Sequence, residues 1–299
     1  MIIYATHSSI YNQLSSFLQK KINNISSSTF TVPKGVKKID VFCVGGGGAG
    51  GIQGGSMYKL PTSSGDIKYY TSIWGGGGGG GGYTNTMKNV AVTPGQQLSV
   101  VVGNGGIRYE FSGGDSSVTI DSGSIISASG GKAGYQHGGS MINCSSVESG
   151  SCGGSGGGRG ADYSTDWSSI PSYNMLAPES TFPTFDNGGK DGGNSGNFWR
   201  ASQSETAHQE TTFIEDNFKG QGTTTRYFGE STGTLYSNGG SGGNLSFNFF
   251  GIAPSANTGG GGNGGPNGGV NSSFSQFHIY NHGGSEGASG ICIIRWGKQ

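Results

Sequence analysis

Charged and apolar side chains are both scarce in this chain of 299 residues. Charged residues make up 11% of the sequence and hydrophobic residues 31%. A conventional aliphatic core needs more apolar surface, and a disordered chain solvated by its own charge needs more charged residues. The formal net charge is zero, with 17 basic and 17 acidic residues, so nothing indicates nucleic-acid binding. Something other than ordinary side-chain packing must therefore satisfy the backbone.

Several other signals are missing. No run approaches the roughly 18 apolar residues of a membrane span, and Met1–Ser9 has no basic start followed by an apolar stretch, so we expect no signal peptide and no membrane insertion. The four cysteines are then expected to be thiols, because the cytoplasm is reducing. Cys43 and Cys292 lie in β-like segments and are interpreted as small buried residues. Cys144 and Cys152 lie in a Gly/Ser-rich loop and can form a disulfide in an oxidised particle.

Glycine is the residue that is abundant. The chain holds 64 glycines, including eight in a row at Gly75–Gly82. Collagen is excluded, because it needs glycine at every third position and abundant proline, whereas this chain has clustered glycines and only eight prolines. Consecutive glycines can form the extended helix of polyproline II type, whose N–H and C=O groups bond to neighbouring strands and not within their own. Ordering glycine is entropically costly, so isolated runs would stay flexible. The sequence therefore predicts a cooperative bundle of such polyglycine helices.

Between the glycine runs lie short segments typical of β-strands. Apolar and polar residues alternate in them, and turn residues containing Pro or Gly separate them. Helix signals are nearly absent beyond residue 26. The predicted fold class is all-β with a polyglycine/polyproline-II-type helix bundle. The expected strand segments flank Pro33–Gly35, Thr93–Gly95 and Asp121–Gly123, and the last one is Gly290–Trp296.

The N-terminal segment has a different pattern. Residues 8–26 predict a short helix, with Ser9 as its cap and apolar residues at Tyr11, Leu14 and Leu18. Such a helix can pack on its own domain or serve as an oligomerising or docking segment. We interpret residues 1–29 as the second of these, and residues 30–299 as the glycine-rich β domain.

One large insertion stands out within that domain. Residues 161–258 hold ten acidic and four basic residues, and 15 of the chain's 32 aromatic residues. These aromatics show no steady alternation, so we expect them on loops, as small local cores or as binding platforms. The insertion and the segment 56–74 supply the candidate ligand-binding residues, which are Tyr69, Tyr70, Trp74, Trp167, Trp199 and Tyr227.

Five elements follow one another along the chain. They are T-F-T-V-P-K-G-V-K-K-I-D-V-F-C-V-G-G-G-G, the glycine run ending in Tyr83, V-T-P-G-Q-Q-L-S-V-V-V-G-N-G-G, G-G-D-S-S-V, and G-A-S-G-I-C-I-I-R-W. In order and spacing they resemble the glycine-rich domain at the tips of bacteriophage tail fibres. The resemblance covers about Phe30 to Trp296. Related segments occur in animal receptor ectodomains, where a signal sequence and several disulfides are expected.

The resemblance implies a tail-fibre tip or baseplate-associated receptor-binding protein in the virion, assembled in the host cytoplasm as an oligomer, commonly a trimer. Its partners would be a host-surface glycan or protein, and other tail proteins through the N-terminus. Residues 161–258 have no counterpart in the pattern, and residues 1–29 are far shorter than a fibre shaft. A structural baseplate or virion component is the alternative function. An ice-binding protein would need a flat, regular face, which the insertions interrupt.

Enzymatic and cofactor motifs are weak. G-x-G-x-x-G matches arise by chance at this glycine content, and Lys132 and Lys190 are not followed by the Ser or Thr of a phosphate loop. The segment Gly157–Ser164 resembles one calcium-binding nonapeptide, but it occurs once and Ser164 replaces the apolar anchor. No zinc-ligand spacing exists. We expect no cofactor and no metal.

Two carboxylate pairs deserve comparison with glycosidases. They are Asp162 with Asp166, and Glu215 with Asp216. Solvated loop acids are the simpler interpretation, and no nucleophile motif is visible. We expect a protein that is not an enzyme, with a surface-glycan depolymerase as the remaining enzymatic alternative.

Overall fold

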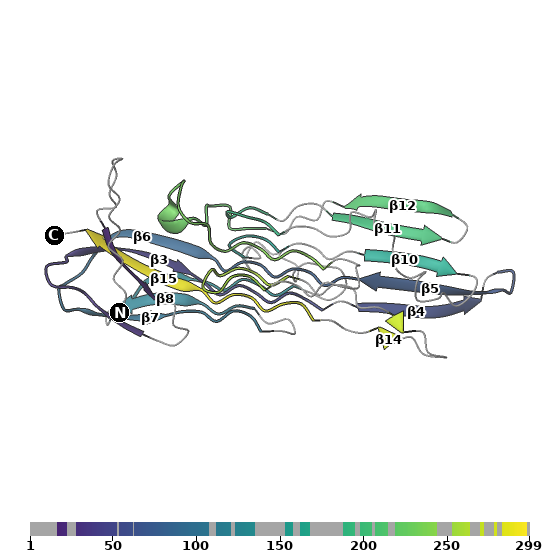
Figure 1. Cartoon of the computed structure of the whole chain (residues 1–299), viewed down its shortest axis with the longest axis horizontal. Helices are drawn as coiled ribbons and strands as arrows, with labels where there is room; N and C mark the ends of the chain where they lie inside the picture. Colours follow the sequence, from purple (N-terminus) through teal and green to yellow (C-terminus); the bar gives the residue numbers. More distant parts are fainter. Residues whose placement is uncertain are drawn as a thin grey trace.

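β-Strands make up nearly all of the regular secondary structure, so the all-β prediction is confirmed. The molecule is elongated in Figure 1, with sheets at both ends and extended glycine-rich segments running between them. The computed structural model describes residues 17–22, 28–52, 54–61, 63–107, 112–120, 123–134, 153–157, 162–167, 188–194, 198–204, 207–214, 219–243, 253–263, 270–271, 278–279 and 283–297.

The first four-stranded sheet joins the two ends of the chain. Its strand order is β1-β15-β3-β6, and all neighbours are antiparallel. The bounds are Phe17–Ile22 for β1, Ile291–Gly297 for β15, Lys38–Val44 for β3 and Thr84–Ala91 for β6.

The N-terminal helix prediction is wrong for residues 17–22. These residues form β1, in which Phe17 lies opposite Gly297 and Ile22 opposite Cys292. Pairing with a strand about 270 residues away outweighs a weak local helix pattern, which propensity alone does not fix. The rest of the predicted helix, residues 8–16 and 23–26, lies outside the described residues.

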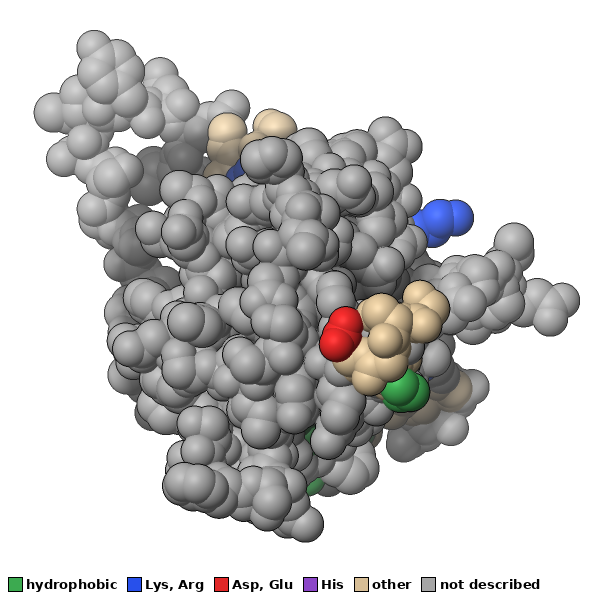
Figure 2. All heavy atoms as spheres, turned by 90° about the vertical axis from the view of Figure 1, so that its right-hand side faces the viewer, with side chains coloured by type: hydrophobic (Ala, Val, Ile, Leu, Met, Phe, Trp, Pro, Cys, Tyr) green, Lys and Arg blue, Asp and Glu red, His purple; other side chains and the backbone are tan. Residues whose placement is uncertain are grey.

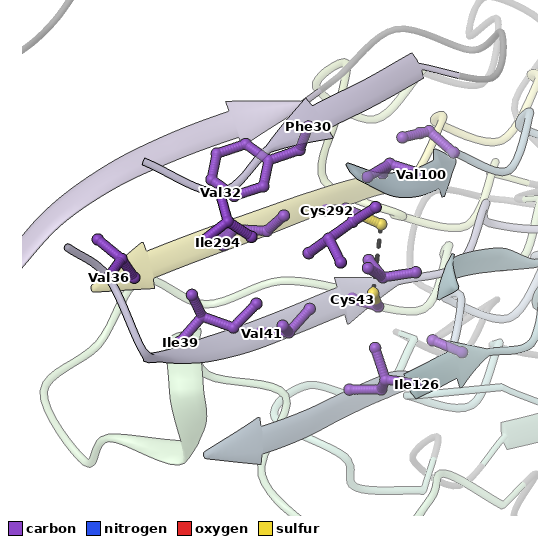
Figure 3. Close-up of a cluster of buried hydrophobic side chains, with 14 residues drawn as sticks. Phe30, Val32, Val36, Ile39, Val41, Cys43, Val100, Ile126, Cys292 and Ile294 are labelled. Atoms are coloured by element: carbon purple, nitrogen blue, oxygen red, sulfur yellow. Dashed lines mark hydrogen bonds between the residues drawn. The ribbon is translucent and has the colours of Figure 1, made fainter. Parts of the chain in front are cut away.

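The second four-stranded sheet packs against the first. Its order is β2-β7-β8-β9, again antiparallel. Fourteen buried side chains from both sheets form the core between them, and Figure 3 shows this cluster. The bounds are Ser28–Thr31 for β2, Gln97–Val101 for β7, Ser116–Ile120 for β8 and Gly123–Ala128 for β9.

The turns predicted at Pro33–Gly35 and Thr93–Gly95 are present, but they connect strands of different sheets. Gly35 and Gly95 both adopt the left-handed backbone that their turns require, with φ of 84° and 83°. The strands flanking Pro33–Gly35 are β2 and β3, and those flanking Thr93–Gly95 are β6 and β7. In each case one strand lies in each sheet of the sandwich. Of the three predicted strand pairs, only β8 and β9 pair directly with each other.

Cys43 and Cys292 are buried in the sandwich core, as predicted. They lie opposite each other on β3 and β15, with sulfur atoms 3.2 Å apart, and both are free thiols. The hydrogen bond with Cys292, together with burial, raises the pKa of the Cys43 thiol well above its ordinary value. Both cysteines therefore serve as small core residues. Cys144 and Cys152 lie outside the described residues.

The third sheet lies at the opposite end of the molecule from β1 and β15 (Figure 1). Its five strands have the order β12-β11-β10-β5-β4, and all pairs are antiparallel except β10 with β11. The bounds are Ala207–Ile214 for β12, Phe198–Ser204 for β11, Asp162–Trp167 for β10, Ile67–Trp74 for β5 and Gly54–Pro61 for β4.

Two short strands and one 3-10 turn complete the described elements. Strands β13 (Val270–Asn271) and β14 (His278–Ile279) pair with each other. The 3-10 turn η2 spans Tyr227–Gly229.

Backbone hydrogen bonds with a three-residue period link the glycine segments between the two ends. The N–H of Gly45 donates to the carbonyl of Tyr83, which follows the eight-glycine run, at 2.9 Å. Within that run, Gly80 accepts from the N–H of Gly48 at 2.9 Å, and Gly77 accepts from the N–H of Gly51 at 2.7 Å. The N–H groups of Gly47 and Gly50 donate to a different segment, at Ala288 and Ser285. The segment from Gly45 to Gly51 thus bonds to the eight-glycine run and Tyr83 through every third residue, and to residues 285–288 through residues that lie between those positions.

The insertion at 161–258 takes part in this network. Within the eight-glycine run, Gly81 donates to Ser155, and Gly79 accepts from Gly240 inside the insertion. Gly239 in turn donates to Gly189. The insertion also contributes β10, β11, β12 and η2. The prediction that it is a loop is therefore wrong for these elements, because long-range backbone pairing organises them.

The first testable prediction concerns the packing of the glycine run. A Cβ atom on Gly79 would overlap the carbonyl oxygen of Gly48, whereas one on Gly283 would meet nothing within 4 Å. We expect Gly79→Ala to lower the free energy of unfolding by about 3 kcal/mol or to prevent folding, since backbone atoms cannot move aside as a side chain does. Gly283→Ala is the matched control, and we expect it to be neutral or slightly stabilising. Urea denaturation compares the two, and equal stabilities would contradict the close packing.

Candidate functional site

Five of the six candidate aromatic residues lie in one sheet. Tyr69, Tyr70 and Trp74 are on β5, Trp167 ends β10, and Trp199 is on β11. The five-stranded sheet brings them together from segments separated by more than 120 residues. The sixth candidate, Tyr227, lies elsewhere, in η2.

The strand register assigns these residues to faces of the sheet. Trp167 is the cross-strand partner of Tyr69, while Tyr70 and Trp74 are the partners of Asp166 and Asp162. Directly paired residues share a face, and neighbours along a strand alternate between faces. Tyr69, Trp167 and Trp199 therefore lie on one face, which we call the Tyr69 face. Tyr70 and Trp74 lie on the other, which we call the Tyr70 face.

The expectation that these aromatics sit on loops is wrong, since all five are strand residues. Alternation was hard to recognise because both faces carry aromatic residues, so Tyr69 and Tyr70 are neighbours in sequence. The pairing partners are also far apart in the chain, and local pattern contains no information about them. Sequence reasoning selected the residues but not their arrangement.

The register also reveals polar residues that sequence reasoning missed. Ser72 on β5 pairs with Ser56 on β4 and with Ser164 on β10, and Ser164 pairs with Ser202 on β11. We call these four residues the serine row. No local signal identifies it, since isolated serines are common in this chain. Four strands must be aligned before the row exists.

The β4–β5 turn lies beyond this sheet at the tip of the molecule (Figure 1). Pro61 and residues 63–66 are exposed, and Gly65 has a φ of 87°. Figure 2 looks onto this end and shows an acidic side chain beside polar and hydrophobic atoms at the surface. The turn is therefore accessible to a large partner.

Of the two candidate carboxylate pairs, only Asp162 with Asp166 lies among the described residues. Asp162 and Asp166 lie four residues apart on β10, so about 13 Å of extended strand separates their Cα atoms. The carboxyl groups of glycosidases are roughly 5 to 9.5 Å apart. Glu215 and Asp216 lie outside the described residues.

Metal-binding groups and membrane-spanning helices are absent from the residues that the structure describes. Across the described residues no group of three or more His, Cys, Asp or Glu side chains is arranged to hold a metal ion. The calcium-like segment Gly157–Ser164 is described only at Gly157 and from Asp162 onward. In the same part of the chain, no helix combines the length and hydropathy needed to cross a bilayer.

Tyr227 belongs to a second hydrophobic cluster on the outer side of β3 and β15. Phe42, Phe228 and Tyr236 are buried there together with Val44, Ile291 and Ile293, and Tyr227 packs against them. The Tyr227 ring centroid is 4.5 Å from that of Phe228 and 6.0 Å from that of Phe42. Burial raises the pKa of Tyr227 to about 12, although the charge of Arg295 opposes the rise. The structure therefore separates Tyr227 from the other five candidates and gives it a packing role.

Arg295 fixes the same segment to the sheet. Its guanidinium Nε is 3.0 Å from Asp40 Oδ2, one Nη is 2.6 Å from Glu230 Oε1, and its centre lies 3.9 Å from the Phe228 ring centroid. Burial alone would lower the pKa of Arg295, but hydrogen bonds with Glu230 and Asp40 outweigh it and raise the pKa above its ordinary value. β3 and β15 thus bind residues 227–236 together, β15 through Arg295 and β3 through the ring of Phe42.

Comparison with known proteins identifies the family. The model described as the glycine-rich domain matches residues 23–297. The chain belongs to this glycine-rich domain family. The match begins after β1 and includes the other strands of the two sandwich sheets, the glycine segments and the five-stranded sheet. No curated protein matches the chain.

The ion pairs of Arg295 lead to a second prediction. Arg295→Met would leave Asp40, whose side chain is only 14% exposed, without its cationic partner. We expect a loss of about 2 to 3 kcal/mol in the free energy of unfolding. The matched control is Arg226→Met, which breaks a more exposed ion pair with Asp191 and should cost at most about 1 kcal/mol. Chemical denaturation measures the free energy of unfolding of both variants. A larger loss in Arg226→Met would contradict the stabilising role given to the Arg295 ion pairs.

A third prediction follows from the burial of Tyr227. Tyr227→Ala should lower stability by about 2 to 4 kcal/mol, because ring contacts and buried area are lost, whereas Tyr227→Phe should retain stability at neutral pH. The folded protein holds the phenol proton more tightly than the unfolded chain does. This contribution to stability is therefore complete below about pH 10 and is lost as the pH rises toward 12. Urea unfolding at pH 9 and 11 should show a smaller alkaline loss in Tyr227→Phe than in the parent protein.

Proposed function

We propose that this protein is a bacteriophage tail-fibre tip, or another tail-associated receptor-binding protein, that recognises the host cell surface through the five-stranded sheet. The ordered series of five sequence elements that resembles tail-fibre tips supports the phage assignment. The recognised ligand is a host-surface glycan, since tyrosine and tryptophan rings are the side chains that stack on sugar rings.

The separation of the two ends of the molecule carries this proposal. β1 and β15, the first and last strands, lie at one end, and the sheet with five candidate aromatics lies at the other (Figure 1). A protein attached to a fibre through its N-terminal segment would present that sheet outward. The docking role of residues 1–29 and the virion location are part of the proposal.

We infer that the glycine segments form a bundle of polyglycine helices of polyproline II type. The three-residue period of the hydrogen bonds donated by Gly45, Gly48 and Gly51 supports this, because such a helix has three residues per turn. Bonds to several neighbours at once make the connection between the ends stiff. A stiff connection holds a binding surface at a fixed distance from its mount.

The proposed mechanism is non-enzymatic and multivalent. Each sheet binds glycan weakly, and a homotrimer raises the overall affinity by effective concentration. The spacing of Asp162 and Asp166 along β10 gives no support to the depolymerase alternative. A structural baseplate or virion component is the competing function.

Steric blocking of either end provides the fourth prediction. Gly65 and Gly95 are matched sites, because each is an exposed turn glycine with positive φ and open space around it. A compact folded tag inserted between Ser64 and Gly65 should reduce binding of labelled, purified protein to host cells at least tenfold. The same tag between Pro94 and Gly95, at the β6–β7 turn of the other end, should leave binding within twofold of the parent.

Two results would contradict the proposal. Equal loss with both tags would mean that the five-stranded end is not specific for attachment. Absence of saturable cell binding by the intact oligomer, across the candidate hosts, would favour the structural virion component.

A further inference from the structure

The serine row forms a continuous line of hydroxyl-bearing residues across the five-stranded sheet. Ser56, Ser72, Ser164 and Ser202 are successive cross-strand partners on β4, β5, β10 and β11. Glu210 on β12 is the next partner, opposite Ser202. Neighbouring strands are about 4.8 Å apart, so the four serines extend over about 14 Å and Glu210 adds about 5 Å. The line is longer than one sugar ring and runs perpendicular to the strands.

Aromatic and acidic residues flank the serine row on the same face. On one side, Tyr58, Tyr70 and Asp166 are successive partners on β4, β5 and β10. Each lies two positions along its strand from a serine of the row. The Tyr70 face therefore combines hydroxyl, carboxylate and aromatic residues around one line.

The other flank also carries aromatic and charged residues. Trp74 is the partner of Asp162, and Asp162 is the partner of Arg200 on β11. These residues also lie two positions from the serine row along their strands. Serines thus occupy the middle line, and aromatic and charged residues are among those that border it on both sides.

The Tyr69 face differs in the corresponding line. Met57, Thr71, Thr165 and Gln203 occupy the line next to the serine row on that face. Its paired positions carry a single charged residue, Lys59, opposite Tyr69. It has no carboxylate to accept hydrogen bonds from sugar hydroxyls, so the two faces are chemically distinct.

We propose that the Tyr70 face is the glycan-binding face, and that a neutral, hydroxyl-rich polysaccharide binds along the serine row, across the strands. This inference rests on the proposed function and deepens it. Serine hydroxyls donate to and accept from sugar hydroxyls, and Asp162, Asp166 and Glu210 accept from them. Tyr70 and Trp74 supply the ring surfaces on which sugars stack.

Charge on this face selects for neutral ligands. Three acidic residues and two basic ones, Lys68 and Arg200, occupy its paired positions. A strongly anionic glycan gains no net attraction from such a surface. Binding to a neutral polysaccharide should accordingly change little with salt concentration, because screening acts on charged partners.

The fifth prediction compares the two faces at adjacent positions. Ser72 and Ser164 are cross-strand partners, and so are their chain neighbours Thr71 and Thr165. The double variant Ser72→Ala with Ser164→Ala removes two hydroxyls from the Tyr70 face. The control double variant Thr71→Val with Thr165→Val removes two from the Tyr69 face on the same two strands.

The experiment begins with whole-cell adsorption of the full-length oligomer to select a host strain. Neutral and anionic polysaccharide fractions purified from the surface of that strain then serve as probes in a calorimetric titration at low and high salt. We expect the serine variant to bind at least tenfold more weakly than the parent, since each lost hydrogen bond is worth a factor of several. The threonine variant should bind within twofold, and both should match the parent in thermal unfolding.

The outcomes separate this inference from the proposed function. Unchanged glycan binding by the serine variant, or a larger loss in the threonine variant, would overturn the choice of face while leaving receptor binding intact. Cell binding that purified polysaccharide cannot compete would overturn the glycan assignment and point to a protein receptor. Absence of cell binding by the parent would overturn both.

Discussion

The fold depends on hydrogen bonds between the backbones of glycine segments. Where a glycine such as Gly79 lies against the carbonyl of Gly48, no side chain fits, so backbone groups approach closely enough to bond in several directions. Buried backbone N–H and C=O groups require partners, and here neighbouring segments provide them in place of regular sheets or α-helices. This constraint explains how a chain with so few apolar residues orders its central region. It also explains why long insertions are tolerated, since each returns a glycine segment to the same network.

The sandwich end supplies the conventional core and anchors the network. β3 and β15 are buried on both faces, because the sandwich core covers one side and the Phe42 cluster covers the other. On the side of the Phe42 cluster, Arg295 forms ion pairs with Asp40 on β3 and with Glu230, which follows η2. The insertion is therefore tied to the first sandwich sheet, while its strands β10, β11 and β12 join β4 and β5 in the five-stranded sheet at the other end. One segment of the chain thus links the two ends that the proposed function requires.

Strong local patterns were good predictors of structure here. The alternation at residues 39–44 and 290–296 and the Pro-Gly turns correspond to real strands and turns, and the burial of Cys43 and Cys292 follows from their β context. Weak patterns failed. The apolar spacing around Leu18 suggests a helix, but that segment is the edge strand β1, which pairs with β15. Tyr227 is a ligand-binding candidate by sequence, yet it packs on Phe42, because exposure depends on what the rest of the chain brings against a residue.

The sequence by itself determined the class of the molecule: an all-β, glycine-rich chain with short strands, specific turns and a group of aromatic residues outside the core. These properties follow from composition and local backbone preference. Only the tertiary structure decided which strands pair, which aromatics gather at the distal end and which face each occupies. The serine row is the clearest case, since its four residues come from strands spread over about 150 positions of the chain. Cross-strand register is a relation between distant segments, and no local preference contains it.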